Sequence, residues 1–322
     1  MPLNYPNRRQ ASQVLVACCA VWAFSFPAMK SLALLGNRTA PGNSSFFFAA
    51  LCVAERFTFA SVLLLCLPWL KLSRLTRGEI KQGLGLGVFG AAGLILQMDG
   101  MAYTHASTAA FLTQGYCVWI PLWFAFRNRR MPRWTTLGAT GLVLVGAAIL
   151  NDVGSGGLRL GRGEFENLLG SVFFAAQILW LERREFTGNH VGRFSLVMFL
   201  TMAGLCLPLA LVLANDPRAV LHAYSSPPAL VLMGGLTVFC TLLTFLLANR
   251  WQPEVPATEA GLLYCTEPVF TFGVTLFLPG LIARWTGINY ANEMLTWNLL
   301  TGGGLILAAN VWMQLQPAAP PE

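Results

Sequence analysis

The feature that most constrains this chain is a succession of ten apolar stretches, each close to the length that crosses a membrane as a helix. The hydrocarbon core of a bilayer is about 30 Å thick and takes about 20 helical residues. Backbone polar groups in lipid must be paired within the segment, so stretches of this length predict helices. The expected spans are residues 12–34, 46–70, 82–103, 107–126, 134–151, 165–181, 194–214, 228–249, 257–279 and 295–315.

The composition supports a membrane protein and excludes a soluble enzyme with its own core. Charged residues make up only 11% of the chain and hydrophobic residues 55%, whereas soluble domains carry about 25% charged residues. The predicted fold class is therefore an all-α membrane protein with ten transmembrane helices. The eight cysteines lie in apolar runs without metal-type spacing, so we expect helix packing from them, with no metal site and no cofactor.

The basic residues predict the orientation in the membrane. With the N-terminus in the cytoplasm, 14 of the 21 basic residues fall on the cytoplasmic side and 6 on the other. This bias satisfies the positive-inside rule. Ten spans then place both termini in the cytoplasm, at a cell (inner) membrane. Topology accounts for the net charge of +7, and nucleic acid is not an expected partner.

An internal repeat divides the chain into two parts. A shift of 151 residues superimposes residues 106–112 on 257–263, and a shift of 163 superimposes Trp134 and Gly141 on Trp297 and Gly304. We expect a first five-helix repeat over 1–155, a second over 156–316, and a short tail at 317–322. Because five is odd, the second repeat is inverted in the membrane, an arrangement common in secondary transporters.

Several motifs also resemble those of a known family. Residues 22–30 (WAFSFPAMK), Arg56-Phe57, 101–113 (MAYTHASTAAFLT), 267–271 (EPVFT) and 293–306 (EMLTWNLLTGGGLI) resemble the EamA-type members of the drug/metabolite transporter superfamily. The resemblance implies a ten-helix bundle of two inverted repeats around a central cavity that moves small metabolites. It also implies a structural or gating role for Arg56. One departure is an insertion after Pro279-Gly280, for which we expect a short interfacial segment over residues 281–291 covering the external mouth.

Intramembrane polar groups are the candidate functional residues, because each is unfavourable in lipid unless it is paired or hydrated. Glu267 lies near the middle of the ninth stretch, and Pro268 leaves a backbone carbonyl without its usual donor. Tyr264, Glu267 and Thr271 are spaced to share one helical face. An unpaired Glu267 would be neutral when shielded and ionised when water reaches it, and could carry a proton. A buried hydrogen bond that holds a kinked helix is the alternative.

The other candidate substrate-binding residues are amides, one phenol and aromatic rings. They are Gln97, Gln114, Tyr116, Gln177, Trp22, Phe26, Trp119 and Trp180. Amides suit polar uncharged or zwitterionic solutes, and a largely apolar cavity with a few polar groups is typical of small-molecule sites. Interhelical packing is the alternative for each. Gln114 and Tyr116 are about 200° apart on a continuous helix, so we expect only one to face a cavity.

These observations predict a secondary transporter that moves a small organic metabolite, such as an amino acid, by alternating access. Its partners would be the solute, the lipid bilayer, protons if transport is coupled to them, and another copy of the chain if it oligomerises. No Walker A sequence and no intramembrane Ser/His pair occur, so an enzyme is not expected. A membrane sensor without transport, or a lipid-modifying enzyme, are the alternatives. Export and import stay equally open.

Overall fold

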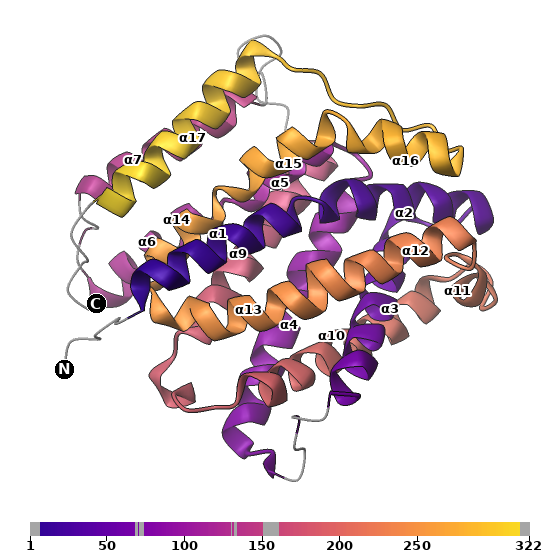
Figure 1. Ribbon diagram of the computed structural model, residues 1–322, viewed down its shortest axis with the longest axis horizontal. Coiled ribbons are helices and arrows are strands. Elements are labelled where there is room, and N and C mark those ends of the chain that lie inside the picture. Colours follow the sequence, from indigo (N-terminus) through magenta and orange to yellow (C-terminus); the bar gives the residue numbers. More distant parts are fainter. Residues whose placement is uncertain are drawn as a thin grey trace.

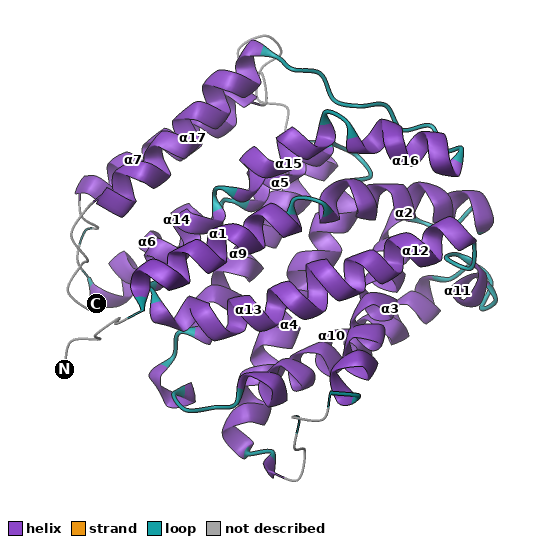
Figure 2. Ribbon diagram, in the orientation of Figure 1, coloured by secondary structure: helices purple, strands orange, loops and turns teal. Residues whose placement is uncertain are grey.

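In the computed structural model, which describes residues 7–67, 70, 74–129, 131, 134–150 and 161–315, every long regular element is a helix (Figures 1 and 2). The helices before residue 151 are α1 (Arg8–Trp22), α2 (Ser25–Thr39), α3 (Ser45–Leu65), α4 (Arg77–Gly100), α5 (Ala106–Thr113), α6 (Tyr116–Asn128) and α7 (Trp134–Leu150). Those after residue 160 are α9 (Arg162–Leu181), η2 (Arg184–Phe186), α10 (Val191–Leu213), α11 (Ala219–His222), α12 (Pro227–Gly235), η3 (Leu236–Leu243), α13 (Thr244–Trp251), η4 (Gln252–Glu254), α14 (Ala257–Tyr264), α15 (Glu267–Thr275), α16 (Leu278–Thr286) and α17 (Trp297–Leu315).

The described helices confirm a helical membrane protein but give fewer candidate spans than ten. Six helical runs are long and apolar enough to cross a bilayer, and a seventh qualifies if the pair 257–275 and 278–286, bent by 50°, is one span. The other three expected stretches are helical but fall short. The first turn of α9 carries Arg162, Glu164 and Glu166, α7 has 17 residues, and the apolar part of α17 is residues 300–309. The expected boundary at 155/156 and the tail at 317–322 lie outside the described residues.

Three of the expected helices are interrupted near their middles. The first is broken between α1 and α2, the fourth between α5 and α6, and the ninth between α14 and α15. A proline follows two of the breaks closely, Pro27 in α2 and Pro268 in α15. Proline has no N–H for the preceding turn, so it allows a helix to restart rather than continue. At the breaks, backbone hydrogen bonds run to the third residue back, as from Phe24 N to the Val21 carbonyl and from Cys265 N to the Leu262 carbonyl.

The eighth expected helix is continuous but widened. Its central segment, η3, is a π-helix, a form that is rare and often lies at functional sites. Within it the Cys240 carbonyl accepts hydrogen bonds from two side chains of other helices, Trp22 Nε1 at 3.1 Å and Arg56 Nη2 at 2.8 Å. The widened turn thus joins α1 and α3 to the second part of the chain.

Packing around the centre depends on close contacts between long helices. Helix α4 packs along α9 and α10, α3 along α10, and α7 along α17 (Figure 1). Gly83 and Gly87 of α4 allow α10 to approach. A Cβ at Gly83 would lie 2.5 Å from the Phe194 carbonyl oxygen, and one at Gly87 would lie 2.5 Å from Thr201 Cβ. Small residues let helices in lipid approach until dispersion forces hold them together.

Candidate functional site

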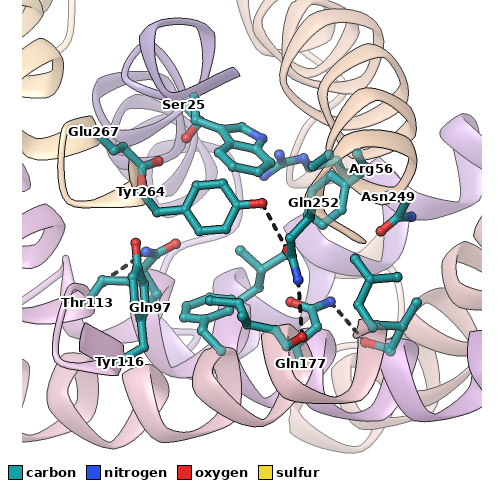
Figure 3. A pocket seen from close by; sticks show the side chains of 18 residues that line it. Ser25, Arg56, Gln97, Thr113, Tyr116, Gln177, Asn249, Gln252, Tyr264 and Glu267 are labelled. Atoms are coloured by element: carbon teal, nitrogen blue, oxygen red, sulfur yellow. Dashed lines mark hydrogen bonds between the residues drawn. The ribbon is translucent and has the colours of Figure 1, made fainter. Parts of the chain in front are cut away.

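A partly open cavity lies between the interrupted helices and α3, α4, α9 and α13 (Figure 3). The apolar part of its lining is Trp22, Leu86, Leu94, Phe174, Ile178, Leu181, Phe245 and Ala248. The polar part is Ser25, Arg56, Gln97, Thr113, Tyr116, Gln177, Asn249, Gln252, Tyr264 and Glu267. No side chain of α7, α10 or α17 is among these lining residues.

The breaks in the fourth and ninth helices place four of the polar groups in the cavity. Thr113 is the last residue of α5 and Tyr116 the first of α6, whereas Tyr264 is the last of α14 and Glu267 the first of α15. Side chains that flank a helix break are freed from the regular 100° spacing, so both ends of a break can present groups to one space. Trp22 stands at the break between α1 and α2 and lies edge-on to Tyr264, with 5.7 Å between ring centroids.

Glu267 is buried and has one described hydrogen-bond donor. Its side chain is 9% exposed, and Gln114 Nε2 donates to its Oε2 at 3.3 Å. The same amide nitrogen also donates to the Ala110 carbonyl at 3.1 Å, and Gln114 Oε1 accepts from the Tyr116 hydroxyl. A chain of hydrogen bonds therefore runs from Tyr116 through Gln114 to the carboxylate and sets its orientation. No described ion pair involves Glu267.

Arg56 faces the same cavity from α3 and is 2% exposed. Its guanidinium donates to Thr241 Oγ1, to the Cys240 carbonyl at 2.8 Å and to Met29 Sδ at 3.5 Å. All three acceptors are uncharged, and no described carboxylate pairs with Arg56. The cavity thus contains one cation and one acid that are not paired with each other.

The amides at the other end of the cavity use their nitrogens within the protein. Gln97 donates to Thr113 Oγ1 at 3.0 Å and Gln177 to the Leu86 carbonyl at 3.0 Å. Asn249 Nδ2 donates to Ser195 Oγ at 2.9 Å, and no described hydrogen bond uses the carbonyl oxygens of these three amides. Gln252 is held at both ends, because it accepts from the Tyr264 hydroxyl at 2.9 Å and donates to the Ile178 carbonyl at 3.1 Å. Fixed amide oxygens suit a ligand that donates hydrogen bonds.

Six of the ten sequence-predicted residues line this cavity, and four do not. Trp22, Gln97, Tyr116, Gln177, Tyr264 and Glu267 line it. Phe26 is 1% exposed and packs in the hydrophobic core with α3. Trp119 donates to Ser171 Oγ at 2.9 Å, and Trp180 donates to the Gln82 carbonyl at 3.2 Å beside Arg183. Both tryptophans are interhelical contacts.

Gln114 is the fourth residue outside the cavity lining, and it differs most from its expected place. On a continuous helix it would point away from Tyr116. The break between α5 and α6 instead brings the two side chains into direct hydrogen-bond contact. Tyr116 lines the cavity and Gln114 does not. Gln114 instead donates a hydrogen bond to Glu267.

Several lining residues were not among the sequence candidates. Arg56, Ser25, Thr113, Asn249 and Gln252 all line the cavity. Asn249 and Gln252 lie at the end of the eighth apolar stretch. Polar residues are common there in any membrane helix, because the helix end meets water. Arg56 carried the clearest signal, since an arginine inside an apolar stretch requires a specific reason. The described residues contain no group of three or more His, Cys, Asp or Glu side chains that could hold a metal ion.

The insertion after α15 does not contribute to the lining. Residues 278–286 form α16, Gly287 ends it at a φ of 71°, and the following residues lead back to α17 (Figure 1). This segment contacts the first part of the chain. Glu293 Oε1 accepts from the Ser107 amide at 3.3 Å, and Lys30 Nζ lies 5.9 Å from the Tyr290 ring centroid.

Comparisons with known proteins agree with this architecture. Residues 11–152 match the EamA-like transporter family. A relative from Archaeoglobus fulgidus, named as an uncharacterized transporter, is 25% identical over 269 residues, which cover 82% of this chain and 76% of that protein. A solved crystal structure superimposes with a TM-score of 0.64 at 16% identity and covers 96% of this chain and 97% of its own, which shows a shared fold.

These matches and the helical membrane fold confirm the family that the sequence motifs resembled. The chain is an all-helical multi-pass membrane protein, and its residues 11–152 match the EamA-like transporter family.

Proposed function

We propose that this protein is a secondary transporter that binds a small zwitterionic metabolite, such as an amino acid, in the cavity and moves it by alternating access. One observation carries the proposal. Arg56 and Glu267 line the same cavity and are bonded to neutral groups instead of to each other. A solute with a carboxylate and an ammonium group would supply both missing partners. The apolar wall of Trp22, Phe174 and Phe245 would receive its side chain.

Ten spans in two inverted repeats are part of the proposal. The shift of 151 residues that aligns the two sequences also aligns two helix breaks, since Thr113 and Tyr116 map onto Tyr264 and Glu267. The shift of 163 maps Trp134, the first residue of α7, onto Trp297, the first of α17, and these two helices pack together. Agreement between sequence shifts and helix ends supports a duplicated unit.

The orientation proposed is the one that the basic residues predict, with both termini in the cytoplasm of a cell (inner) membrane. Reporter fusions after Arg130 and after Arg184 are expected to read cytoplasmic, and a fusion after Gly156 to read external. External readings at both basic loops would overturn the proposed orientation. Readings on opposite sides would overturn the inverted-repeat arrangement, because two spans separate these loops.

Movement in this mechanism takes place at the helix breaks. Each break lacks part of the hydrogen-bond ladder, so the half-helices on either side can tilt with little loss of backbone bonding. Glu267 is the proposed proton carrier. It is shielded by Gln114 in the present arrangement, and it would ionise when the cavity opens to water.

The test of function is uptake into proteoliposomes that contain the purified protein. Labelled amino acids are presented with and without a pH gradient, and empty liposomes give the background. Solute accumulation, or exchange of internal for external solute, supports transport. Binding to the purified protein without any movement into the vesicles would identify a sensor instead and would overturn the proposal.

A further inference from the structure

A second charged cluster lies away from the cavity, where the end of α4 meets the start of α9. Asp99 on α4 is fully buried, and its Oδ2 pairs with Arg162 Nη2 at 2.6 Å. Glu166, one turn along α9, pairs with Arg162 Nε at 2.7 Å, and its side chain is 12% exposed. None of these three residues lines the cavity. An aspartate near the end of an apolar stretch would ordinarily be solvated, whereas this one is enclosed.

The geometry around Arg162 places two carboxyl groups beside each other. Nε and Nη2 form one edge of the planar guanidinium, the edge that usually binds both oxygens of a single carboxylate. Here that edge takes one oxygen from each of two acids. Because both acids bind this one edge, their carboxyl groups lie side by side.

The remaining oxygens of the two acids lack a donor. Asp99 Oδ1 and Glu166 Oε2 are both buried without a hydrogen-bond partner among the described residues. The amide oxygen of Asn167 is in the same condition, and this fully buried side chain lies against Gly100, the residue after Asp99. Buried acceptors without donors are unfavourable, because each has lost its hydrogen bonds to water. Three such oxygens at one helix junction indicate that a ligand supplies the missing positive charge or hydrogen.

The charges point to the same conclusion. Two ionised carboxylates and one guanidinium leave a net charge of −1 in a place where Asp99 has no access to water. Like charges this close are not both stable in the ionised form. One bound proton would neutralise the excess and would provide the donor that Asp99 Oδ1 and Glu166 Oε2 both lack.

We propose that Asp99 and Glu166 form a proton-binding site, with one proton held between Asp99 Oδ1 and Glu166 Oε2 and with Arg162 balancing the remaining carboxylate. The site is separate from Glu267 and does not depend on the identity of the transported solute. It joins α4 to α9, the helices that present Gln97 and Gln177 to the cavity. Loss of the proton leaves an unbalanced charge at this junction and weakens the packing of the two helices at that end.

The other titratable groups near this junction are few. The Tyr103 hydroxyl accepts a hydrogen bond from Arg162 Nη1 at 2.8 Å, and the Tyr103 ring lies 4.4 Å from the guanidinium carbon. Glu164 in the first turn of α9 and His105 before α5 have no described hydrogen bond or ion pair with either acid. Among the described residues, Arg162 is the one cation that forms an ion pair with Asp99 or Glu166.

Infrared spectroscopy of the purified protein in lipid nanodiscs tests the proposal. All variants carry Glu267→Gln, so that the cavity acid cannot contribute. A protonated carboxyl gives a carbonyl band that shifts in D₂O. This band is expected to persist at neutral pH, well above the pH of about 4 at which ordinary Asp and Glu ionise. Asp99→Asn and Glu166→Gln should each abolish it, because the remaining acid then pairs with Arg162 alone.

Two further variants keep the test decisive if Asp99→Asn does not fold. Glu164→Gln, which removes a neighbouring acid outside the pair, should leave the band unchanged. Arg162→Gln should extend the band to higher pH, because the pair loses its positive neighbour. A band that survives Glu166→Gln, or that Arg162→Gln shifts to lower pH, overturns the proposal. Loss of the band when sodium replaces choline as the only added cation would also overturn it and would identify a sodium site.

Discussion

The breaks in the fourth and ninth expected helices lie at positions related by the shift of 151 residues but carry different chemistry. Each break ends one half-helix and starts the next with a cavity-lining side chain, Thr113 and Tyr116 in one case and Tyr264 and Glu267 in the other. The backbone arrangement is shared, yet the group that starts the second half-helix is a neutral phenol at α6 and an acid at α15. The comparison teaches that the fold provides a place for polar groups at each break, whereas side-chain identity gives only the second break a carboxyl group.

The partner residues sharpen the contrast. Gln114 lies within the first break but bonds across to the second, where its amide nitrogen donates to Glu267. The Tyr116 hydroxyl in turn donates to Gln114. The first break therefore positions the acid of the second, and the two breaks act as one site. Four predictions, from the largest expected effect to the smallest, test how far this difference extends.

The largest effect is expected from Glu267→Gln, which keeps the shape and hydrogen bonding of the side chain but removes its titration. This variant should fold and still exchange solute across proteoliposomes, with weaker binding because the amide accepts a hydrogen bond from the ammonium group without a charge. It should lose accumulation driven by a pH gradient. The matched control is Tyr116→Phe, at the equivalent position of the other break, which should retain gradient-driven accumulation. Full accumulation by the Gln variant would exclude a proton role for Glu267 and leave it as a structural hydrogen-bond acceptor.

The next effect concerns the cation that faces the acid across the cavity. Arg56→Met removes the guanidinium and leaves an apolar chain of similar length. A hydrogen bond to a charged group contributes about 1.5–3 kcal/mol, so affinity for a zwitterionic solute should fall about ten- to hundredfold. Binding is measured by calorimetry on the purified protein. Arg250→Met, an exposed basic residue paired with Glu254, is the control. Equal losses in both variants would argue against a carboxylate-binding role for Arg56.

A smaller effect is expected from the segment that distinguishes the second part of the chain from the first. Replacing residues 283–290 with a short Gly/Ser linker removes the contact of Tyr290 with Lys30. The change keeps buried Ile282 and the hydrogen bond from the Ser107 amide to Glu293. If the segment covers the cavity mouth, solute exchange should become a few times faster while the yield of folded protein is unchanged. Identical exchange rates would show that the segment is a tolerated surface loop.

The smallest effect is expected for an acid that belongs to neither break. A hydrogen bond from Lys81, with the nearby positive charges of Arg183 and Lys81, lowers the pKa of Glu185 below its usual value. A lowered folded-state pKa contributes stability above the pKa of the unfolded chain, and this stability is lost as pH falls through the folded pKa. Glu185 is exposed, so solvent screens the pair.

Thermal unfolding of Glu185→Gln should therefore match that of the unaltered protein in acid and differ barely, if at all, at neutral pH. Gradient-driven transport should stay unchanged. A clear loss of accumulation in this variant would mean that acids outside the two breaks take part in proton coupling. The difference between the two breaks would then not account for the coupling.

The sequence by itself determined the class of the protein and identified Glu267 as the main candidate among its acids. Long apolar stretches admit only helices in lipid, and the shifts of 151 and 163 residues predicted equivalent positions before any helix end was known. Glu267 and Tyr264 were identifiable because polar groups at membrane depth are unfavourable without a purpose. The same reasoning applied to Arg56, although the family resemblance implied a gating role rather than a place in the cavity lining.

Only the tertiary structure decided which of the polar and aromatic candidates meet. In a membrane, lipid and protein interior are both apolar, so hydrophobic periodicity does not show which face of a helix turns inward. For this reason Phe26, Trp119 and Trp180 were indistinguishable from Trp22 by sequence, yet only Trp22 lines the cavity. A helix break also cancels the regular angle between neighbours, which is why Gln114 reaches both Tyr116 and Glu267. Such contacts depend on where neighbouring helices end, and no local pattern in one segment encodes that position.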